Sequence, residues 1–562
     1  MTNKDIARNL RRTARLMAIN GENSFKVRAY EKAADNVRQH RESISRQVQE
    51  GRELEIEGVG KAIAGALREL VETGTYDKLE RLREEIPEGV IELSEVPGIG
   101  PKKLETLWKE IGITSIEELL KACESGKLLE YKGFGEKTQS RLYNAVLYYD
   151  RNRNKMHLST AREFDAQLRE EMGDPLSKQL LPTGSFYRNC PTLQGLQYVF
   201  PLDQQAQLTE KLRQHQRQIK APDATTLEIA LDKGFTARVQ LAAAERMANE
   251  QLAGSLFGEH LEALQPHLAA PAATEAELYE RAGLPFIPPE LRENTGELQL
   301  AREDRLPDLL ELSQLQGILH AHSTYSDGKA TLENMAQACI ERGYHYLGIT
   351  DHSQSAFYAN GLKPERVLKQ QKEIEKLNKK LAPFRIFSGI ESDILPDGRL
   401  DYTDEVLASF DFVIASVHSG FQMDEAKATQ RLVTAIENPF TTILGHPTGR
   451  LLLNREGYPI NHRKVIDAAA ANGVAIEVNA NPWRLDLDWT WIPYALEKGV
   501  YLAICPDGHS TEGIDDVYYG TAVARKGRLT PSATLNTLSA QALEDYFARR
   551  KAGHPQHSQQ TG

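Results

Sequence analysis

Histidine and carboxylate side chains recur directly after short apolar runs in the second half of this sequence. Nine of them follow six such runs: His320, His322, Asp327, His352, Glu391, His418, His446, Asp507 and His509. Imidazole and carboxylate ligands without thiolates are typical of sites for Zn²⁺, Mn²⁺ or Fe²⁺. Nine ligands exceed one tetrahedral site, so the sequence predicts two or three divalent metal ions as cofactors.

A metal cluster of this kind is suited to hydrolysis. Metal ions lower the pKa of bound water to about 7, and they neutralise charge on a phosphoryl group during transfer. An acyl or amide substrate could be attacked by the same water, so the residue types alone leave the substrate class open. A single histidine after a strand is more often structural, but six histidines and three carboxylates at strand ends favour a metal site.

The segments that must position these ligands alternate regularly between strand and helix. Helical patterns, for example over 332–342, 364–380 and 463–472, separate apolar runs at 317–319, 346–350, 385–390, 412–417, 441–445, 474–479 and 501–505. Seven such units predict a parallel sheet, closed into a barrel if its ends meet. The ligands lie at the carboxyl ends of the strands, where barrel enzymes hold their sites. Because residues i and i+2 of a strand point the same way, His320 pairs with His322 and Asp507 with His509.

The first half of the chain contains three Gly-x-Gly turns between amphipathic helical patterns. The turns and their neighbouring lysines are Gly58, Gly60 and Lys61; Gly98, Gly100, Lys102 and Lys103; and Gly133, Gly135 and Lys137. Each resembles the helix-hairpin-helix motif. Glycine allows the turn to approach a phosphate, and the N–H groups that open the next helix point toward the anion. The turns therefore predict DNA binding through the backbone, independent of sequence.

Bulk properties describe an ordinary soluble protein. The 562 residues suggest three or four domains, and the net charge of −11 excludes a uniformly basic nucleic-acid coat. There is no apolar run of membrane-spanning length and no secretory signal pattern, so we expect no membrane partner. The four cysteines are far apart, which is typical of a reducing cytoplasm. We expect a cytoplasmic, nucleoid-associated monomer.

The ligand-bearing segments resemble the motifs of the polymerase-and-histidinol-phosphatase (PHP) family. They are His320-Ala-His-Ser, Asp351-His, Gly389-Ile-Glu-Ser-Asp, Ser416-Val-His-Ser, Gly445-His-Pro-Thr-Gly-Arg and Pro506-Asp-Gly-His-Ser. The resemblance implies a distorted seven-stranded (βα)7 barrel and fills all nine family ligand positions. It would give His320, His322, Glu391 and Asp507 to one ion, with Glu391 bridging to a second held by His418 and His446. Asp327, His352 and His509 would hold the third.

The whole chain resembles the bacterial X-family DNA polymerases that carry a PHP domain. The segments Phe25-Lys-Val-Arg-Ala-Tyr and Gly283-Leu-Pro-Phe-Ile-Pro-Pro-Glu-Leu-Arg-Glu carry this likeness. It implies a small helical DNA-binding domain over 1–85 and a helix-hairpin-helix domain over 86–155. An α/β nucleotidyltransferase palm and thumb over 156–295 and a linker over 296–315 then precede a PHP domain over 316–562.

The palm departs from the family pattern where polymerisation requires carboxylates. The family's three metal-binding aspartates fall on Gly195, Gln197 and Ala237, none of which can replace them. The lysine that gives some relatives lyase activity falls on Ala66. The resemblance therefore implies an inactive polymerase core.

These observations predict a DNA-binding, metal-dependent phosphoesterase. The resemblance implies 3′-to-5′ exonuclease or 3′-end processing in base-excision repair, on gapped or 3′-ended DNA. Arg450 and Arg484, just past strand ends, are candidates to clamp the substrate phosphate, although a salt-bridge role fits their positions equally. Two alternatives stay open: an active repair polymerase with a proofreading PHP domain, and a non-catalytic DNA-repair scaffold.

Overall fold

A computed structural model describes residues 1–40 and 42–552 of the chain. The chain forms two compact units: unit 1 spans Met1–Arg153 and unit 2 begins at Asn154. Within the described residues, the helices are all too short or too polar to cross a lipid bilayer.

Unit 1 is entirely helical. Its helices are α1 (Asn3–Ile19), α2 (Ser24–Gln39), α3 (Ile44–Gln49), α4 (Lys61–Thr73), α5 (Asp77–Glu85), α6 (Glu88–Leu93), α7 (Pro101–Glu105), α8 (Ile116–Glu124) and α9 (Glu136–Asn152). A side-chain cap begins α1, where Thr2 and Asp5 form a reciprocal capping box. Apolar side chains from 1–85 and from 86–153 share one core, so both predicted N-terminal domains lie in a single packed unit.

Unit 2 opens with a mixed five-stranded sheet. Its strands run in the order β2 (Leu181–Pro182), β4 (Leu196–Pro201), β7 (Thr236–Ala242), β6 (Thr226–Ala230) and β5 (Ile219–Asp223), and only β4 and β7 are parallel. Helices α10 (Leu158–Met172) and α13 (Gln205–Gln214) contribute to its core. A helical segment follows, with α14 (Met247–Ser255), α15 (Gly258–Leu264) and α16 (Glu275–Arg281).

The stretch 296–315, predicted as a linker, carries buried residues toward both of its ends. It contains helix α17 (Glu297–Arg302), whose Leu298 and Ala301 join the core of the preceding helical segment. Glu297 is buried, and it accepts a hydrogen bond from Nδ1 of His260 at 3.0 Å. Leu310 and Leu315 instead join the core of the domain that follows. The stretch therefore acts as an ordered connection.

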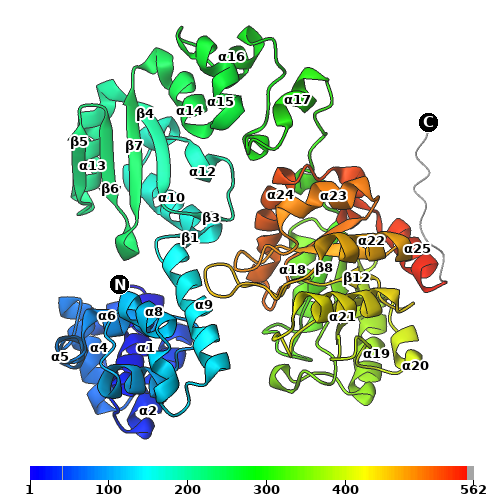
Figure 1. Cartoon of the computed structure of the whole chain (residues 1–562), viewed down its shortest axis with the longest axis horizontal. Helices are drawn as coiled ribbons and strands as arrows, with labels where there is room; N and C mark the ends of the chain where they lie inside the picture. Colours follow the sequence, from blue (N-terminus) through cyan, green and yellow to red (C-terminus); the bar gives the residue numbers. More distant parts are fainter. Residues whose placement is uncertain (41, 553–562) are drawn as a thin grey trace. The chain divides into compact units, whose positions relative to one another are not determined.

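A seven-stranded parallel sheet forms the rest of unit 2, as predicted. Its strands are β8 (Gly317–Ala321), β9 (Tyr346–Ile349), β10 (Arg385–Asp393), β11 (Phe412–Ser416), β12 (Ile443–Leu444), β13 (Ala475–Asn479) and β14 (Leu502–Cys505), adjacent in chain order. Helices surround it, including α18 (Leu332–Glu341), α19 (Pro364–Leu381), α21 (Glu425–Glu437) and α22 (His462–Asn472) (Figure 1). All seven strands are buried, which explains their nearly continuous apolar sequences.

The two edge strands of this sheet meet, so that it forms a nearly closed barrel. At the carboxyl end, the His322 amide donates to the Gly508 carbonyl at 2.9 Å and the Gly508 amide to the His320 carbonyl at 3.3 Å. Closer to the other end, the side chain of Asn536 bonds the carbonyls of Gly317 and Ile504. The barrel seam between β8 and β14 is thus closed at both ends.

Candidate metal centre

The nine predicted ligand side chains converge at the carboxyl end of the barrel. Glu391, only 1% exposed at the end of β10, lies at the middle of the cluster. Its carboxylate is 3.0 Å from the nearest nitrogen of His352 and of His446, 3.1 Å from His418, 3.4 Å from His320 and 3.7 Å from His322. Asp507 lies 3.1 Å from His322 and 3.5 Å from His320.

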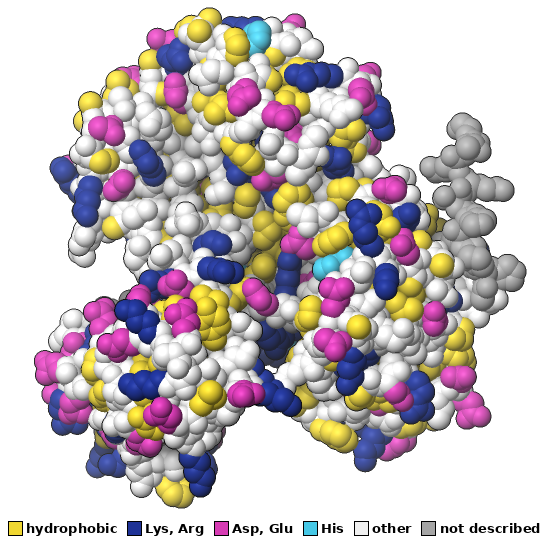
Figure 2. Space-filling view, viewed as in Figure 1, with side chains coloured by type: hydrophobic (Ala, Val, Ile, Leu, Met, Phe, Trp, Pro, Cys, Tyr) yellow, Lys and Arg dark blue, Asp and Glu magenta, His cyan; other side chains and the backbone are white. Residues whose placement is uncertain are grey.

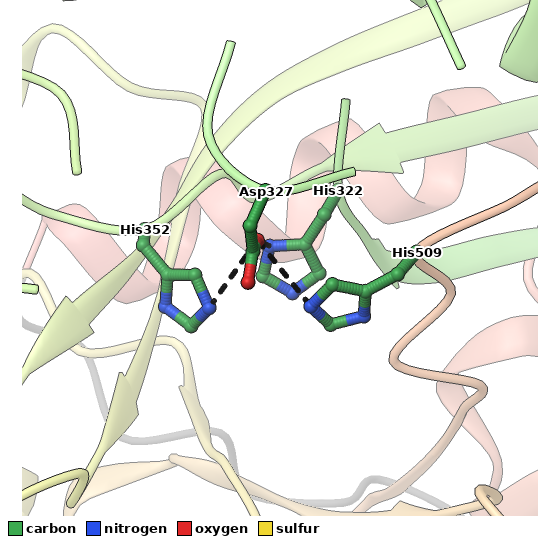
Figure 3. Close-up of side chains that lie close together, drawn as sticks. All are labelled: His322, Asp327, His352 and His509. Carbon is green, nitrogen blue, oxygen red and sulfur yellow. Dashed lines mark ion pairs between the residues drawn. The ribbon is translucent and has the colours of Figure 1, made fainter. Parts of the chain in front are cut away.

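A second group of side chains adjoins the first. The ligand atoms of His322, Asp327, His352 and His509 lie within 4.8 Å of one another (Figure 3). Asp327 Oδ1 is 3.4 Å from His509 Nε2 and 3.7 Å from His352 Nε2. His322 also belongs to a trio with His320 and Glu391, so it connects the two groups.

Left-handed backbone, rather than simple strand alternation, aims two of these ligands. His320 has φ = 65° and Asp507 has φ = 53°, and the β8–β9 pairing is irregular between Ile318 and Ala321. His322 and the pair Asp507 and His509 lie beyond the ends of their strands. The expected i, i+2 geometry is therefore wrong in detail, although both pairs reach the cluster. Non-glycine residues held at positive φ are strained, and such strain concentrates at functional sites.

Buried carboxylates that the sequence reasoning did not assign hold the histidine rings. His320 Nδ1 donates to Glu477 at 2.5 Å, and His418 Nδ1 donates to Asp393 at 2.5 Å. Each bond leaves Nε2 free to face the cluster, as in the carboxylate–histidine–metal arrangement. A glutamate between apolar residues of strand β13 was a signal for Glu477, and the i+2 spacing from Glu391 was one for Asp393.

Asp351, which precedes His352, supports the loop that carries other ligands. It is fully buried and accepts hydrogen bonds from the backbone and hydroxyl groups of Ser323 and Ser326 and from the amide of Gln370. Burial raises its pKa despite these bonds. Its oxygens are therefore occupied in fixing the 323–326 turn that leads to Asp327.

The cluster contains buried polar atoms that have no protein partner, as expected of side chains arranged to bind cations. Nε2 of His320, Nδ1 of His322, Nδ1 of His352 and Oε2 of Glu391 are buried and have no hydrogen-bond partner within the described residues. Buried polar atoms in native proteins are nearly always paired. Imidazole nitrogens and carboxylate oxygens match the donor set of Zn²⁺, Mn²⁺ or Fe²⁺, so these residues fit divalent ions.

Mutual electrostatics keep the carboxylates of the cluster ionised. Burial opposes ionisation of Glu391, but His418 and His320 outweigh it and hold its pKa well below the ordinary value. His320 and His322 do the same for the pKa of Asp507. Burial and the neighbouring His352 lower the pKa of His322 to about 3, which keeps that ring neutral and able to bind a cation.

The two predicted arginines differ in their surroundings. Arg450 donates Nε to the Arg484 carbonyl at 2.8 Å, Nη1 to Asp488 at 2.5 Å and Nη2 to the Leu485 carbonyl. Its guanidinium is engaged within the surrounding loops, which favours the salt-bridge role that its position also allowed. Arg484 Nε instead lies 3.6 Å from Asp507, which favours Arg484 as the candidate for substrate contact.

The five-stranded sheet carries a separate cavity of about 450 Å³ that includes Gly195 and Gln197, two of the three positions predicted for palm aspartates. Its described lining residues include Lys155, Ser185, Gln197 and Arg238, and Glu228 supplies the single carboxylate among them. Gly195 and Gln197 lie on this cavity, and Ala237 is buried in β7 beside Leu196. The residues at the three aspartate positions therefore provide no carboxylate here.

Each Gly-x-Gly turn of unit 1 has the same backbone form. The first glycine is left-handed, with φ of 76° at Gly58, 84° at Gly98 and 95° at Gly133. The second glycine, at 60, 100 or 135, is the N-cap of α4, α7 or α9 and has no side chain to cover the helix N–H groups. Lys61, Lys102, Lys103 and Lys137 are exposed beside these turns. On the face of unit 1 seen in Figure 2, basic and acidic side chains are interspersed, so this face bears no continuous basic patch.

Comparison with known proteins agrees with this arrangement. Residues 1–76 match the helix-hairpin-helix domain, 90–146 the SAM-like helix-hairpin-helix tandem and 319–481 the PHP domain. Over 572 aligned residues, the chain is 36% identical to the DNA polymerase/3′-5′ exonuclease PolX of Bacillus subtilis (strain 168), covering 98% of this chain and 99% of that protein. This chain belongs to the PolX family.

Some relatives outside the PolX family match only the PHP barrel of this chain. A probable phosphatase of Thermoanaerobacter sp. (strain X514) is 27% identical over 250 residues, which cover 41% of this PolX chain and 94% of that protein. A probable phosphatase of Syntrophotalea carbinolica is 30% identical over 165 residues, 29% of this chain and 64% of that protein. The barrel is therefore a module that also occurs without a polymerase-like region.

Glu477→Gln is expected to weaken metal binding by about ten- to a hundredfold, because the His320 ring loses its orienting charge. Competition with a chromophoric chelator measures the affinity. Glu375→Gln, at an exposed site on α19, is the matched control and should bind ions as the unsubstituted chain does. Equal affinities in the two variants would contradict a ring-orienting role for Glu477.

Proposed function

We propose that this PolX-family chain is a DNA-binding, metal-dependent phosphoesterase that processes DNA 3′ ends in repair. The observation that carries the proposal is the convergence of nine histidine and carboxylate side chains, Glu391 among them, at one end of the barrel. The Bacillus subtilis relative is named as a 3′-5′ exonuclease, which supports a phosphodiester as the substrate. We propose all nine residues as ligands and Arg484 as a contact to the substrate phosphate.

Divalent ions bound by these ligands would polarise a phosphate oxygen and lower the pKa of the attacking water. The protein's own residues prepare the place for that chemistry. Glu477 and Asp393 fix the tautomer and orientation of His320 and His418, and the depressed pKa values of Glu391 and Asp507 keep both carboxylates charged. Arg484 adds a positive charge beside Asp507, where a phosphate oxygen could be paired.

The palm supports the further proposal that polymerisation has been lost. Two-metal nucleotidyl transfer needs several carboxylates on one surface. Among the described residues that line the palm cavity, Glu228 is the one carboxylate. Glu228 pairs with the cationic Arg238 on the neighbouring strand. We therefore propose that the palm serves as a scaffold between DNA-binding helices and the barrel. We further propose that the chain works as a monomer in the bacterial cytoplasm, at the nucleoid.

In the decisive experiment, the full chain is incubated with gapped DNA. The strand with the free 3′ end carries an internal label. Reactions contain Mn²⁺ or EDTA, each with and without the four deoxynucleotides. We expect Mn²⁺-dependent shortening of the labelled strand, no reaction in EDTA and no extension in nucleotides. Extension of the labelled strand would favour the second candidate function, an active repair polymerase. The name of the Bacillus subtilis relative also includes that activity. Binding without either reaction would favour a scaffold.

Lys102→Ala/Lys103→Ala is expected to weaken DNA binding at every sequence tested and to reduce the slope of log affinity against log salt by about 2. The reason is that these exposed lysines flank one Gly-x-Gly turn and would neutralise two phosphates. Fluorescence anisotropy over a salt series measures the slope. Lys121→Ala, an exposed lysine of α8 outside the three turns, is the control; a salt slope unchanged in the double variant would reject this contact.

A further inference from the structure

A histidine of the palm contacts two loops of the barrel. His157, in the short strand β1 (Met156–His157), is 9% exposed. Its ring centroid lies 4.6 Å from that of Trp483, and the two rings are tilted by 30°. Its Nε2 donates to the Leu452 carbonyl at 2.9 Å, across 295 positions of sequence. Burial lowers the pKa of His157, so the ring that makes both contacts is neutral.

The two contacted loops are bonded to each other. The Leu452 amide donates to the Trp483 carbonyl at 2.6 Å. Arg450, two residues before Leu452, donates to the carbonyls of Arg484 and Leu485. Leu485 has a left-handed backbone with φ = 46°, a conformation that persists in a non-glycine residue only where the surroundings enforce it. The position of the loop around Trp483 is therefore set by its contacts.

The loop around Trp483 leads to the metal centre from both sides. Trp483 immediately precedes Arg484, whose Nε lies 3.6 Å from Asp507. In the other direction, the Trp483 amide donates to Asn481 Oδ1 at 3.0 Å, and the Asn481 amide donates to Asn479 Oδ1 at 3.1 Å. The side chain of Asn479 donates in turn to Asp507 at 3.2 Å. A displacement of Trp483 would therefore be transmitted to the surroundings of Asp507.

Trp483 depends on His157 because the barrel leaves much of its side chain exposed. The exposed fraction of Trp483 is 53%. Among the described residues, the ring of His157 is the one aromatic ring within stacking distance of the indole. Aromatic pairs prefer a few offset or tilted arrangements, so the His157 ring restricts the orientation of the indole. The palm, which carries His157, thereby restricts a loop at the rim of the barrel.

We propose that His157 is a positioning residue of the hydrolytic centre, through which the palm holds Trp483 and so places Arg484 beside Asp507. The inference rests on the proposed phosphoesterase function and gives the palm a part in hydrolysis beyond that of a scaffold. A misplacement of about 1 Å can cost about a hundredfold in rate, even when the substituted residue is remote from the chemistry. Loss of the His157 ring should therefore lower activity without removing a metal ligand.

The test is a double-mutant cycle between His157→Ala and Arg484→Ala, in the full chain with Mn²⁺ and gapped DNA. We expect His157→Ala to lower kcat/KM by about ten- to a hundredfold, with unchanged metal content. In the Arg484→Ala background the same substitution should cause no further loss, because a residue that acts through Arg484 has nothing left to position. Full activity of His157→Ala, or losses that multiply in the double variant, would overturn the inference.

Two further substitutions separate positioning from general stability. His157→Phe keeps an aromatic ring against Trp483 and should recover most of the activity that His157→Ala loses. His260→Ala is the matched control, because His260 is a buried histidine that bonds Glu297 in the helical segment. It should lower the unfolding midpoint at least as much as His157→Ala and keep its activity at temperatures where both variants are folded. Equal losses of activity in the two alanine variants would assign the effect to stability and reject a positioning role.

A second readout needs no hydrolysis. The chain contains four tryptophans, so labelling with fluorinated tryptophan gives four fluorine NMR resonances, and Trp483→Phe identifies that of Trp483. We expect His157→Ala to shift or broaden this resonance and to leave the other resonances in place. An unchanged Trp483 resonance would overturn the inference. If the unsubstituted chain hydrolyses no DNA, the proposed function fails, while the resonance still decides whether His157 fixes Trp483.

Discussion

Glu391→Gln is expected to lower kcat for phosphodiester hydrolysis by at least about a thousandfold, which corresponds to the several kcal/mol that metal ions supply to phosphoryl transfer. Glu391 is the single carboxylate within 3.7 Å of five histidines in the described cluster. The amide keeps the shape of the side chain but removes the charge that holds the cations. Elemental analysis should show a loss of bound metal alongside the loss of activity.

DNA binding is expected to survive in this variant, because the Gly-x-Gly turns lie in unit 1. Glu497→Gln, at an exposed end of α23 (Ile492–Glu497), is the control and should behave as the unsubstituted chain. If Glu391→Gln kept more than about a tenth of the activity with full metal content, the cluster would not be the hydrolytic centre.

Arg292→Met is expected to lower the free energy of unfolding of unit 2 by about 3–5 kcal/mol. Arg292 is fully buried, donates twice to Glu275 at 3.0 and 2.9 Å, and lies over the rings of Tyr187 and Tyr279. Methionine would leave the Glu275 carboxylate buried without its partner. Calorimetry should show a fall of several degrees in the unfolding midpoint.

A second substitution separates charge from packing at this site. Arg292→Met/Glu275→Leu should recover most of the lost stability, since a well-packed apolar pair replaces a buried ion pair at little cost. Arg305→Met, which breaks an exposed pair with Glu303, is the control and should change the midpoint little. A midpoint for Arg292→Met equal to that of the control would show that the buried pair contributes nothing.

The barrel could be predicted from sequence because each of its strands and helices has a recognisable pattern within its own segment. Strands such as 412–416 are buried on both faces and appear as unbroken apolar runs, and the helix over Pro364–Leu381 begins at a proline and follows helical periodicity. The candidate ligands could be grouped because each lies at or just past the carboxyl end of a strand, and these strand ends share one edge of the barrel.

What could not be predicted depends on tertiary contacts. Glu477 supports His320 across 157 positions of sequence, and no local pattern links the two. The left-handed backbone at His320 breaks the alternation from which its direction was argued. Position alone left Arg450 open to a phosphate contact or to a salt bridge, because its partners, Asp488 and two carbonyls, come from a loop more than thirty positions away. The sequence of 296–315 is largely polar, yet Leu298 packs into the core of the preceding helical segment and Leu310 packs into the core of the barrel.

Closure of the barrel seam by His320, His322 and Gly508 has a thermodynamic consequence. Divalent ions held by His320 and His322, at and just past the end of β8, and by Asp507, just past β14, would link the first and last strands of the barrel. Occupancy and folding are then linked by mass action, and each tenfold excess of free ion over its dissociation constant adds about 1.4 kcal/mol to the folded state. Chelation would accordingly lower the stability of the barrel. Loss of activity after chelation would then reflect a less stable barrel as well as the missing ions.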